Sequence, residues 1–285
     1  MNTSFGNTYL HDEDIYRGFG NLSRKALLYW KDRVLQYQQN EMLQAASDRM
    51  NADLQSNNLI VFFDHHYAFD AVPIGLALFQ QIKFATGVII PYSVHLEMGV
   101  GREGEPSLRY FMRTKAFRWF VGNIKDSNPG LKFFPVVRDF ETETPRISKI
   151  VEQRYSGVNT IYLRSFIRQF STHQAGKICF MTPFSGIGFP GKPLLHPQLY
   201  RSVDLVQQKC ERRFPVYLLG AYPGWDAYAN YLAPLMTEHL IVMRGPFYLA
   251  QKDYQTAYDQ IAREINNLRE EGNFIAPDYN RILKK

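Results

Sequence analysis

The amino-acid sequence predicts an α/β protein in which a mainly parallel mixed sheet is flanked by helices and preceded by an N-terminal helical segment. Three observations lead to this prediction. Short apolar runs alternate with longer helix-like runs from residue 58 onward, as in βαβ units. The chain has 285 residues, of which 45% are hydrophobic, so it can bury a sizeable core. The earlier residues contain no strand-like run, which divides the chain into an arm with a helical segment (1–55) and an α/β domain (56–285).

The elements are expected in a regular order. Residues 1–20 are polar and indicate a loose arm, and residues 22–55 carry apolar side chains at near-helical intervals. Strand-like runs cover 59–63, 88–91, 133–137, 178–181, 216–219 and 240–243. Helix-like runs cover 71–84, 108–121, 147–170, 199–210 and 254–268. Strands that alternate with helices imply crossover connections, and therefore a mainly parallel sheet.

Composition and charge exclude several classes of protein. An aromatic content of 15% excludes disorder as the main state. The net charge of +6 favours acidic partners such as phosphates, an acidic carrier protein or an anionic membrane surface, and no nucleic-acid-binding motif is present. Two cysteines are too few for a disulfide scaffold. With no signal core and no apolar run of spanning length, we expect a cytoplasmic protein that at most lies against a membrane.

One stretch joins a strand-like run to polar side chains that suit catalysis. The apolar run 59–63 ends in Asp64, His65 and His66, and aspartate returns at Asp70. Open α/β sheets bind their ligands at the carboxyl ends of the strands, where these side chains would lie. A tight turn into a helix can bring His65 and Asp70 together, so that the carboxylate fixes the imidazole tautomer. A purely structural histidine is the alternative at this point.

Two glycine-containing segments match catalytic patterns only in part. Residues 99–104 fit the dinucleotide pattern G-x-G-x-x-G by letter, but Pro106 separates the glycines from the helix that would hold the pyrophosphate, so a surface loop is the better interpretation. Ser185 lacks the preceding glycine of a nucleophile elbow, because Pro183 stands there. The turn at Ser185 and Gly186 can expose backbone N–H groups to an anion, or it can be a plain loop.

A metal site and a basic surface were the other candidates. The tripeptide Asp64-His65-His66 occurs in metal-binding phosphoesterases, but the further strand-end aspartates of such sites are missing, so no metal is predicted. The segment 109–121 mixes basic and aromatic residues and is either a solvated face or a surface for a phosphorylated ligand or lipid. Between residues 102 and 125, six basic residues stand against two glutamates. We therefore expect Arg113 and Arg118 to help capture an anionic substrate.

The order of these features resembles that of the phospholipid/glycerol acyltransferase family, which carries four ordered motifs. The first is His-x-x-x-x-Asp after an apolar strand, and His65 and Asp70 match it. The second ends a strand in a phosphate-binding arginine, as residues 134–138 do with Arg138. The fourth is an apolar strand with a proline, which residues 214–220 resemble. The likeness covers roughly residues 55 to 270 and is closest in style to the soluble glycerol-3-phosphate acyltransferases.

The third motif departs from the family pattern Phe-x-Glu-Gly-x-Arg. Residues 180–186 take its place, with Ser185 and Gly186 where Glu-Gly would be and Gly188 in place of the arginine. The change is similar to a Ser-Gly-Gly version in the soluble plastid members, but the basic residues that follow there are missing here. Phosphate binding by this segment and the identity of the acceptor are therefore left open.

The resemblance implies an enzyme of phospholipid biosynthesis, an O-acyltransferase that uses no metal or other cofactor. It would move a fatty acyl group from acyl-CoA or acyl-carrier protein to a hydroxyl of glycerol 3-phosphate, a lysophospholipid or a related phosphorylated or lipid acceptor, with peripheral membrane contact. His65 would be the base, Asp70 its orienting group and Arg138 the clamp on the acceptor phosphate, while N–H groups near Ser185 and Gly186 would serve the oxyanion or the acceptor. The alternative is a protein on the same fold that binds lipid or acyl chains and has weakened catalysis.

Overall fold

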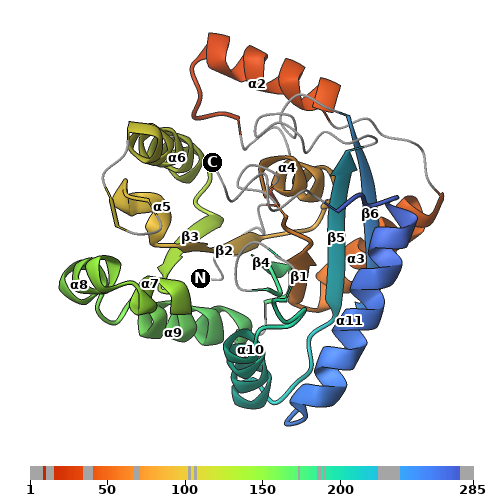
Figure 1. Ribbon diagram of the computed structural model, residues 1–285. Helices are drawn as coiled ribbons and strands as arrows, with labels where there is room; N and C mark the ends of the chain where they lie inside the picture. Colours follow the sequence, from red (N-terminus) through yellow and green to blue (C-terminus); the bar gives the residue numbers. More distant parts are fainter. Residues whose placement is uncertain are drawn as a thin grey trace, which may run out of the picture.

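The computed structural model describes residues 9–10, 16–34, 41–66, 71–101, 104–105, 108–172, 174–184, 188, 191–223 and 238–276. In this part of the chain six strands form one sheet in the order β3-β2-β4-β1-β5-β6 (Figure 1). The strands are β1 (Leu59–Phe63), β2 (Gly87–Ser93), β3 (Leu131–Val136), β4 (Lys177–Met181), β5 (Val216–Pro223) and β6 (His239–Phe247). Neighbouring strands are parallel except β6, which runs antiparallel to β5. The predicted mainly parallel mixed sheet is confirmed.

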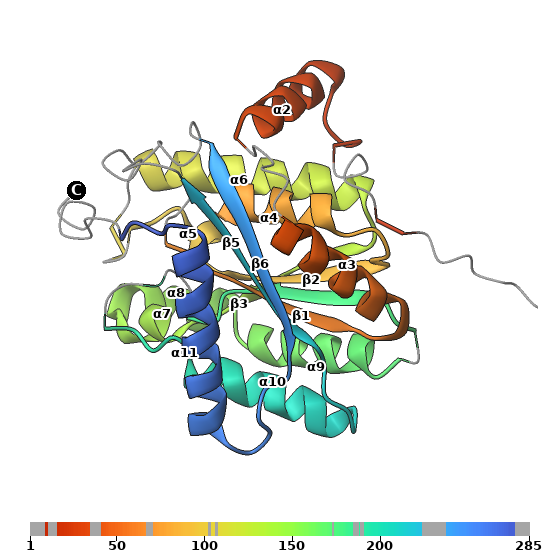
Figure 2. The ribbon, with the colours of Figure 1, turned by 90° about the vertical axis from the view of Figure 1, so that its right-hand side faces the viewer.

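Helices cover both faces of this sheet. They are α2 (Asn21–Val34), α3 (Glu41–Ser56), α4 (Ala71–Gln81), α5 (His95–Met98), α6 (Leu108–Ser127), α7 (Asp139–Glu143), α8 (Pro145–Arg154), α9 (Val158–Phe170), α10 (Pro197–Lys209) and α11 (Tyr254–Glu271). The core on one face contains side chains of α3, α4 and α6, and the core on the other contains side chains of α9, α10 and α11 (Figures 1 and 2). We call these the α4 face and the α10 face.

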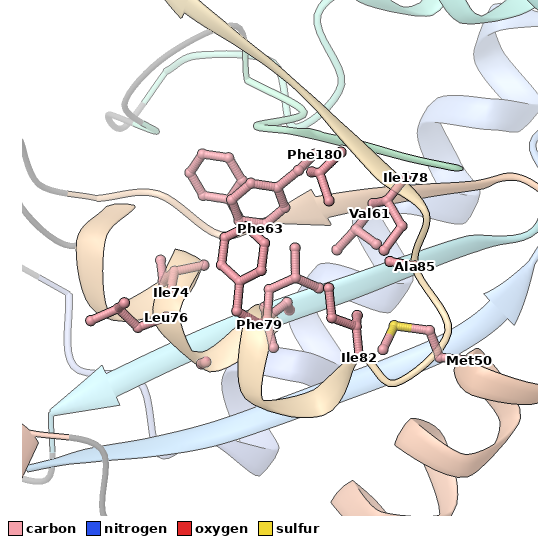
Figure 3. Close-up of a cluster of buried hydrophobic side chains, with 14 of the residues drawn as sticks. Met50, Val61, Phe63, Ile74, Leu76, Phe79, Ile82, Ala85, Ile178 and Phe180 are labelled. Atoms are coloured by element: carbon pink, nitrogen blue, oxygen red, sulfur yellow. The ribbon is translucent and has the colours of Figure 1, made fainter. Parts of the chain in front are cut away.

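The central strand explains why the sequence begins its α/β pattern with an unbroken apolar run. All five residues of β1 are buried, because helices cover both faces and β4 and β5 pair with its two edges. On the α4 face, Val61 and Phe63 pack with Phe180 of β4 and with Ile74 and Phe79 of α4 (Figure 3). The rings of Phe63 and Phe180 are stacked, with centroids 4.5 Å apart.

Two helices predicted as continuous are divided. The run 147–170 forms α8 and α9: α8 ends at Arg154, and Gly157, whose φ of 78° is left-handed, directly precedes α9. The run 22–55 forms α2 and α3, with residues 35–40 between them outside the described part of the chain. The apolar spacing of each half is helical, so periodicity alone did not reveal either division.

The expectation of a loose arm over residues 1–20 is wrong for the residues described. Leu10, Tyr16 and Phe19 are buried in the core of the α4 face. The backbone N–H of Leu10 also donates to the carbonyl of Ala85 at 2.7 Å. These three apolar side chains therefore pack against the domain and bury apolar surface there.

The N-terminal helical segment shares its core with the sheet. Met50 and Leu54 of α3 are buried in the core of the α4 face. The Tyr217 hydroxyl of β5 donates to Asp53 of α3 at 2.6 Å, so a polar contact also joins this helix to the sheet. This arrangement places α3 in the layer of helices that covers the α4 face.

The connections define where a ligand would bind. Strand β1 leads through α4 to β2 on one side, whereas its neighbour β4 leads through α10 to β5 on the other side. Because α4 and α10 lie on opposite faces, the chain leaves the carboxyl ends of β1 and β4 in opposite directions. Open α/β sheets bind ligands at such a reversal. The residues that follow β1 and β4 therefore form the candidate site.

Candidate functional site

The residues after β1 alternate between the two faces of the sheet, as the pleat of a strand requires. Asp64 and His66 are buried and contact each other, with His66 Nε2 2.8 Å from Asp64 Oδ1. His65 lies between them in sequence but turns to the α4 face, where its ring centroid is 5.6 Å from that of Phe63. The two neighbouring imidazoles thus enter different surroundings.

Asp64 is the centre of a buried polar cluster that we call the Asp64 cluster: Asp64, His66, Tyr222 and Arg269. Arg269 near the end of α11 donates from Nε and Nη2 to the two carboxylate oxygens of Asp64, each at 2.9 Å. The Tyr222 hydroxyl at the end of β5 donates to Asp64 Oδ2 at 2.7 Å. This bidentate geometry is the strong form of an arginine–carboxylate pair.

The charges around Asp64 decide its ionisation. Burial by itself would raise the pKa of the Asp64 carboxyl, but the hydrogen bonds and charges of His66 and Arg269 outweigh that effect and hold the pKa far below its usual range. The carboxylate is therefore ionised throughout the physiological range, and the cluster joins α11 to the ends of β1 and β5.

Both ring nitrogens of His66 already have protein neighbours. Nδ1 is 3.2 Å from the carbonyl oxygen of Gly188, opposite the Asp64 carboxylate at Nε2. The ring also lies 4.4 Å from the centroid of Phe274, and only 4% of the side chain is exposed. His66 is therefore built into the fold and has no ring nitrogen directed at a solvent-accessible substrate.

His65 is the less buried histidine of the pair. It is half-buried, and its backbone carbonyl accepts a hydrogen bond from Gly188 N at 2.7 Å, which ties the residues after β1 to those after β4. The residues predicted to work with it, Asp70, Ser185 and Gly186, lie outside the described part of the chain. Their placement relative to the imidazole therefore stays a prediction.

Arg138 lies at the carboxyl end of β3, as predicted, but two strands separate it from β1. Three strand spacings place the two strand ends about 14 Å apart. Part of the side chain is exposed, yet its charged end is deep enough that burial lowers the pKa of the guanidinium, against the effect of the Glu141 carboxylate. The structure therefore places Arg138 at the same edge of the sheet as His65 without bringing the two residues side by side.

The surroundings of Arg138 form a second polar group at this edge. Glu141 is fully buried and accepts hydrogen bonds from the backbone N–H groups of Arg138 and His95, at 2.6 and 2.8 Å, and from the Ser93 hydroxyl. Burial raises the pKa of Glu141 although these donors favour its ionised form. His196, which precedes α10, contacts Asp139 at 3.2 Å and lies close enough to Arg138 for their charges to interact.

Arg113 and Arg118 of α6, predicted to help capture an anionic substrate, have different surroundings in the structure. Arg118 is exposed, and its Nη2 donates to the backbone carbonyl of Glu97 at 2.8 Å. Arg113 is half-buried, with its guanidinium carbon 4.7 Å from the centroid of the Tyr110 ring. The two side chains therefore differ in exposure, because the turn of the helix directs Arg113 toward the protein, and their part in capturing an anionic substrate stays a prediction.

Metal-ligand geometry is not found among the residues that the structure describes, where no three His, Cys, Asp or Glu side chains come together as they would around an ion. Asp64 and His66 do meet, but the guanidinium of Arg269 lies 3.2 Å from His66 Nε2 and pairs with Asp64. A positive side chain in this place disfavours a second cation.

Sequence reasoning missed Arg269 and Tyr222. They stand 205 and 158 residues from Asp64 in the chain, and neither lies in a local pattern that marks it. The useful signal was the aspartate itself, because a carboxylate directly after a fully apolar strand needs a cationic or hydrogen-bonding partner somewhere in the fold.

Comparison with protein-family models gives no match for this chain, and comparison with curated protein sequences gives none either. The family resemblance therefore depends on the order of the motifs along the chain, and the fold is established by the strand order and connections described above. In the described part of the chain no helix is both long and apolar enough to pass through a bilayer.

Proposed function

We propose that this protein is an acyltransferase that moves a fatty acyl group from a thioester donor to a hydroxyl group of a phosphorylated or lipid acceptor. One observation carries the proposal: His65 follows the central strand β1 at the reversal of the connections and turns away from the Asp64 cluster. A general base must be reachable by the proton it accepts. Of the two adjacent imidazoles, His66 is 4% exposed with both nitrogens beside protein atoms, so we propose His65 as the base.

The proposed reaction is a direct transfer. His65 takes the proton of the acceptor hydroxyl as its oxygen attacks the thioester carbonyl, and the tetrahedral intermediate collapses with release of the thiolate, which regains the proton. Asp70 is expected to orient the imidazole, as a carboxylate does in hydrolase triads. Backbone N–H groups at Ser185 and Gly186 are expected to stabilise the developing oxyanion. The scheme needs no covalent enzyme intermediate.

Arg138 is proposed to hold an anionic group at some distance from the reacting hydroxyl. Arg138 lies near His196 before α10 whereas His65 turns to the α4 face, so the two side chains do not converge across the span of about 14 Å between the ends of β3 and β1. This arrangement fits an extended substrate better than a compact one that would contact both residues at once. An anion at Arg138 would also compensate a guanidinium whose pKa burial lowers.

The outer side of α6 supports contact with an anionic membrane surface. Four large apolar side chains on this side of the helix have at least half of their surface exposed: Leu108 (77%), Phe111 (50%), Met112 (59%) and Trp119 (52%). Lys115 and Arg118 lie exposed among them. An exposed apolar stripe with interspersed cations suits the boundary between head groups and acyl chains.

Helix α2 extends this surface. Leu22 (84% exposed) and Tyr29 (65% exposed) project from it, and Figures 1 and 2 place α2 on the same side of the molecule as α6. The ring of Phe19, which precedes α2, packs 5.1 Å from that of Trp119. The two helices together present an apolar and basic face through which a lipid acceptor or an acyl donor would be reached.

The proposal is tested by release of free thiol from a long-chain acyl-CoA, measured with and without glycerol 3-phosphate or a lysophospholipid. We expect release that depends on the acceptor and on His65, since His65→Ala removes the base. A protein that binds the acyl chain but releases no thiol with any of these acceptors would instead be the lipid-binding alternative, which the altered segment after β4 favours.

A further inference from the structure

The edge of the sheet opposite His65 carries a polar depression that the proposed reaction does not use. It has a volume of about 580 Å³ and is lined by the turn after α10 and by the residues before α11, including Gln207, Glu211, Arg212, Arg213, Gln251 and Lys252. Figure 2 shows α10 and the start of α11 at the same end of the molecule. The five residues of β1 alone span about 17 Å, so the depression is remote from the candidate catalytic site.

The cations of the depression are held by carbonyl groups. Arg212 Nη2 donates to the carbonyl of Phe170 at 3.0 Å, and Arg213 Nη2 donates to the carbonyls of Tyr248 and Leu249, each at 2.9 Å. Among the described residues no carboxylate lies within ion-pair distance of Arg212, Arg213 or Lys252. These bonds fix the guanidinium groups in place without neutralising them.

Negative charge near the depression is smaller than the positive charge. Glu211 is the carboxylate of the lining, which leaves an excess of two cations. Asp204 lies beneath and is buried, and its two oxygens accept hydrogen bonds from Lys252 N at 3.2 Å and Gln208 Nε2 at 2.6 Å. An excess of one remains even when Asp204 is counted.

A buried amide supplies a second, independent sign of a ligand. Gln207 is fully buried and lines the depression. Its Oε1 accepts from the backbone N–H of Phe214 at 3.3 Å, whereas its Nε2 has no hydrogen-bond partner in the described structure. A buried donor without a partner costs free energy, so an acceptor atom or a bridging water is expected beside it.

Two residues of the lining have a left-handed backbone. Glu211 and Lys252 adopt φ angles of 53° and 57°, in the left-handed region that favours glycine. Both residues carry long charged side chains that line the depression. At Glu211 this conformation ends α10, because the N–H of Glu211 donates to the carbonyl of Gln208 and the N–H of Arg212 donates to the carbonyl of Gln207, each at 3.2 Å.

We propose that this depression binds a small molecule that carries a phosphate or diphosphate group. Arg212, Arg213 and Lys252 would share the anion, and the glutamine amides would bond a neutral polar part of the ligand or its bridging water. A volume of about 580 Å³ lies in the range of small-ligand sites. The inference does not depend on the proposed acyl transfer, because it concerns the other edge of the sheet.

The test is calorimetric titration of the full chain with inorganic pyrophosphate at low salt. We expect saturable binding of one pyrophosphate with a dissociation constant below about 1 mM. Lys252→Gly should weaken it by about threefold and Glu211→Gly should strengthen it by about threefold, as one unit charge near an exposed anion does. Glycine adopts the left-handed backbone of both positions without a steric cost, so the melting temperatures of both variants should stay near that of the wild type.

The matched control is Asn273→Gly. Asn273 also has a left-handed backbone, with a φ of 48°, but it carries no charge. It follows the far end of α11, and the 18 residues of this helix separate it from the depression. This variant should leave pyrophosphate affinity unchanged. The proposal would be overturned if pyrophosphate gave no saturable heat up to about 10 mM, or if its affinity changed in the same direction in Lys252→Gly and Glu211→Gly. The arginines would then only hold neighbouring loops together through their bonds to backbone carbonyls.

Discussion

The adjacent histidines at the end of β1 differ in burial and in the side chains that they contact. His66 is 4% exposed, and its two nitrogens face Asp64 and the carbonyl of Gly188. His65 is half-buried on the other face, where the ring of Phe63 is its described aromatic neighbour. The difference teaches that the pleat of one strand assigns the two residues to separate tasks. One imidazole is incorporated into a structural cluster, whereas the other turns to the α4 face at the carboxyl edge of the sheet, where we propose that the substrate binds.

The largest effect should come from replacing each of the two histidines in turn, because one is expected to affect turnover and the other stability. His65→Ala should lower turnover by about two to four orders of magnitude and leave the melting temperature within a few degrees of the wild type. His66→Ala should lower the melting temperature strongly, because it removes one partner of a buried charge. Thiol-release kinetics and thermal unfolding on both variants provide the measurement. An active His65→Ala together with a stable but inactive His66→Ala would reverse the assignment.

The next largest effect concerns the Asp64 cluster. Arg269→Ala should lower the free energy of unfolding by about 3 kcal/mol, because it leaves the fully buried Asp64 carboxylate without its bidentate partner. Arg263→Ala on the same helix is the control, since Arg263 is 66% exposed and its pair with Glu264 is a surface pair. Urea denaturation should detect less than about 0.5 kcal/mol for the control. Equal losses in both variants would contradict the structural role of the cluster.

The pH dependence of stability gives a third comparison. The folded-state pKa of Asp64 lies far below its unfolded value of about 3.9, so its contribution is complete above about pH 4 and is lost as the pH falls toward the folded-state pKa. Each pH unit in that window should cost the wild type about 1.4 kcal/mol through this residue. Asp64→Asn should be less stable at pH 7 and should lack this part of the acid dependence. The measurement is the free energy of unfolding of the wild type and of Asp64→Asn between pH 7 and pH 3. If Asp64 were not the group responsible, the two plots of this free energy against pH would be parallel.

A smaller effect is expected at Arg138, which lies at the same edge of the sheet but beside neither histidine. Arg138→Lys should raise the KM for an anionic acceptor by about fivefold and change kcat little, because lysine keeps the charge and loses the planar fork. Arg154→Lys on the exposed side of α8 is the matched control. Unchanged kinetics in Arg138→Lys would leave Arg138 as a structural partner of Glu141.

The smallest effect should be on capture of the donor by α6. Reversal of Arg118 to glutamate should lower kcat/KM for the donor by a few fold at low salt, and the difference should disappear near 0.1 M salt, where exposed charges more than about 10 Å apart are screened. The same reversal at Arg113 should act through stability instead, because Arg113 is half-buried against Tyr110. A donor kcat/KM that is independent of salt and of Arg118 would leave α6 as ordinary surface.

The sequence by itself determined the sheet and the place of its polar strand ends. Short unbroken apolar runs such as 59–63, rich in β-branched and aromatic residues, favour strands buried on both faces, and their alternation with helical runs indicates crossovers. The position of His65 directly after such a run was therefore predictable, and so was the position of Arg138 at the end of another. These features depend on residues that are close in the chain, which is why local pattern sufficed.

Only the tertiary structure decided which partners these residues have. The order β3-β2-β4-β1 separates Arg138 from His65 by two strands, and no local pattern encodes strand order. Arg269 reaches Asp64 across 205 residues because α11 packs over β5 and β6, and that contact makes His66 structural. The physical reason is that burial and charge pairing depend on distances in space, whereas the sequence records only distances along the chain.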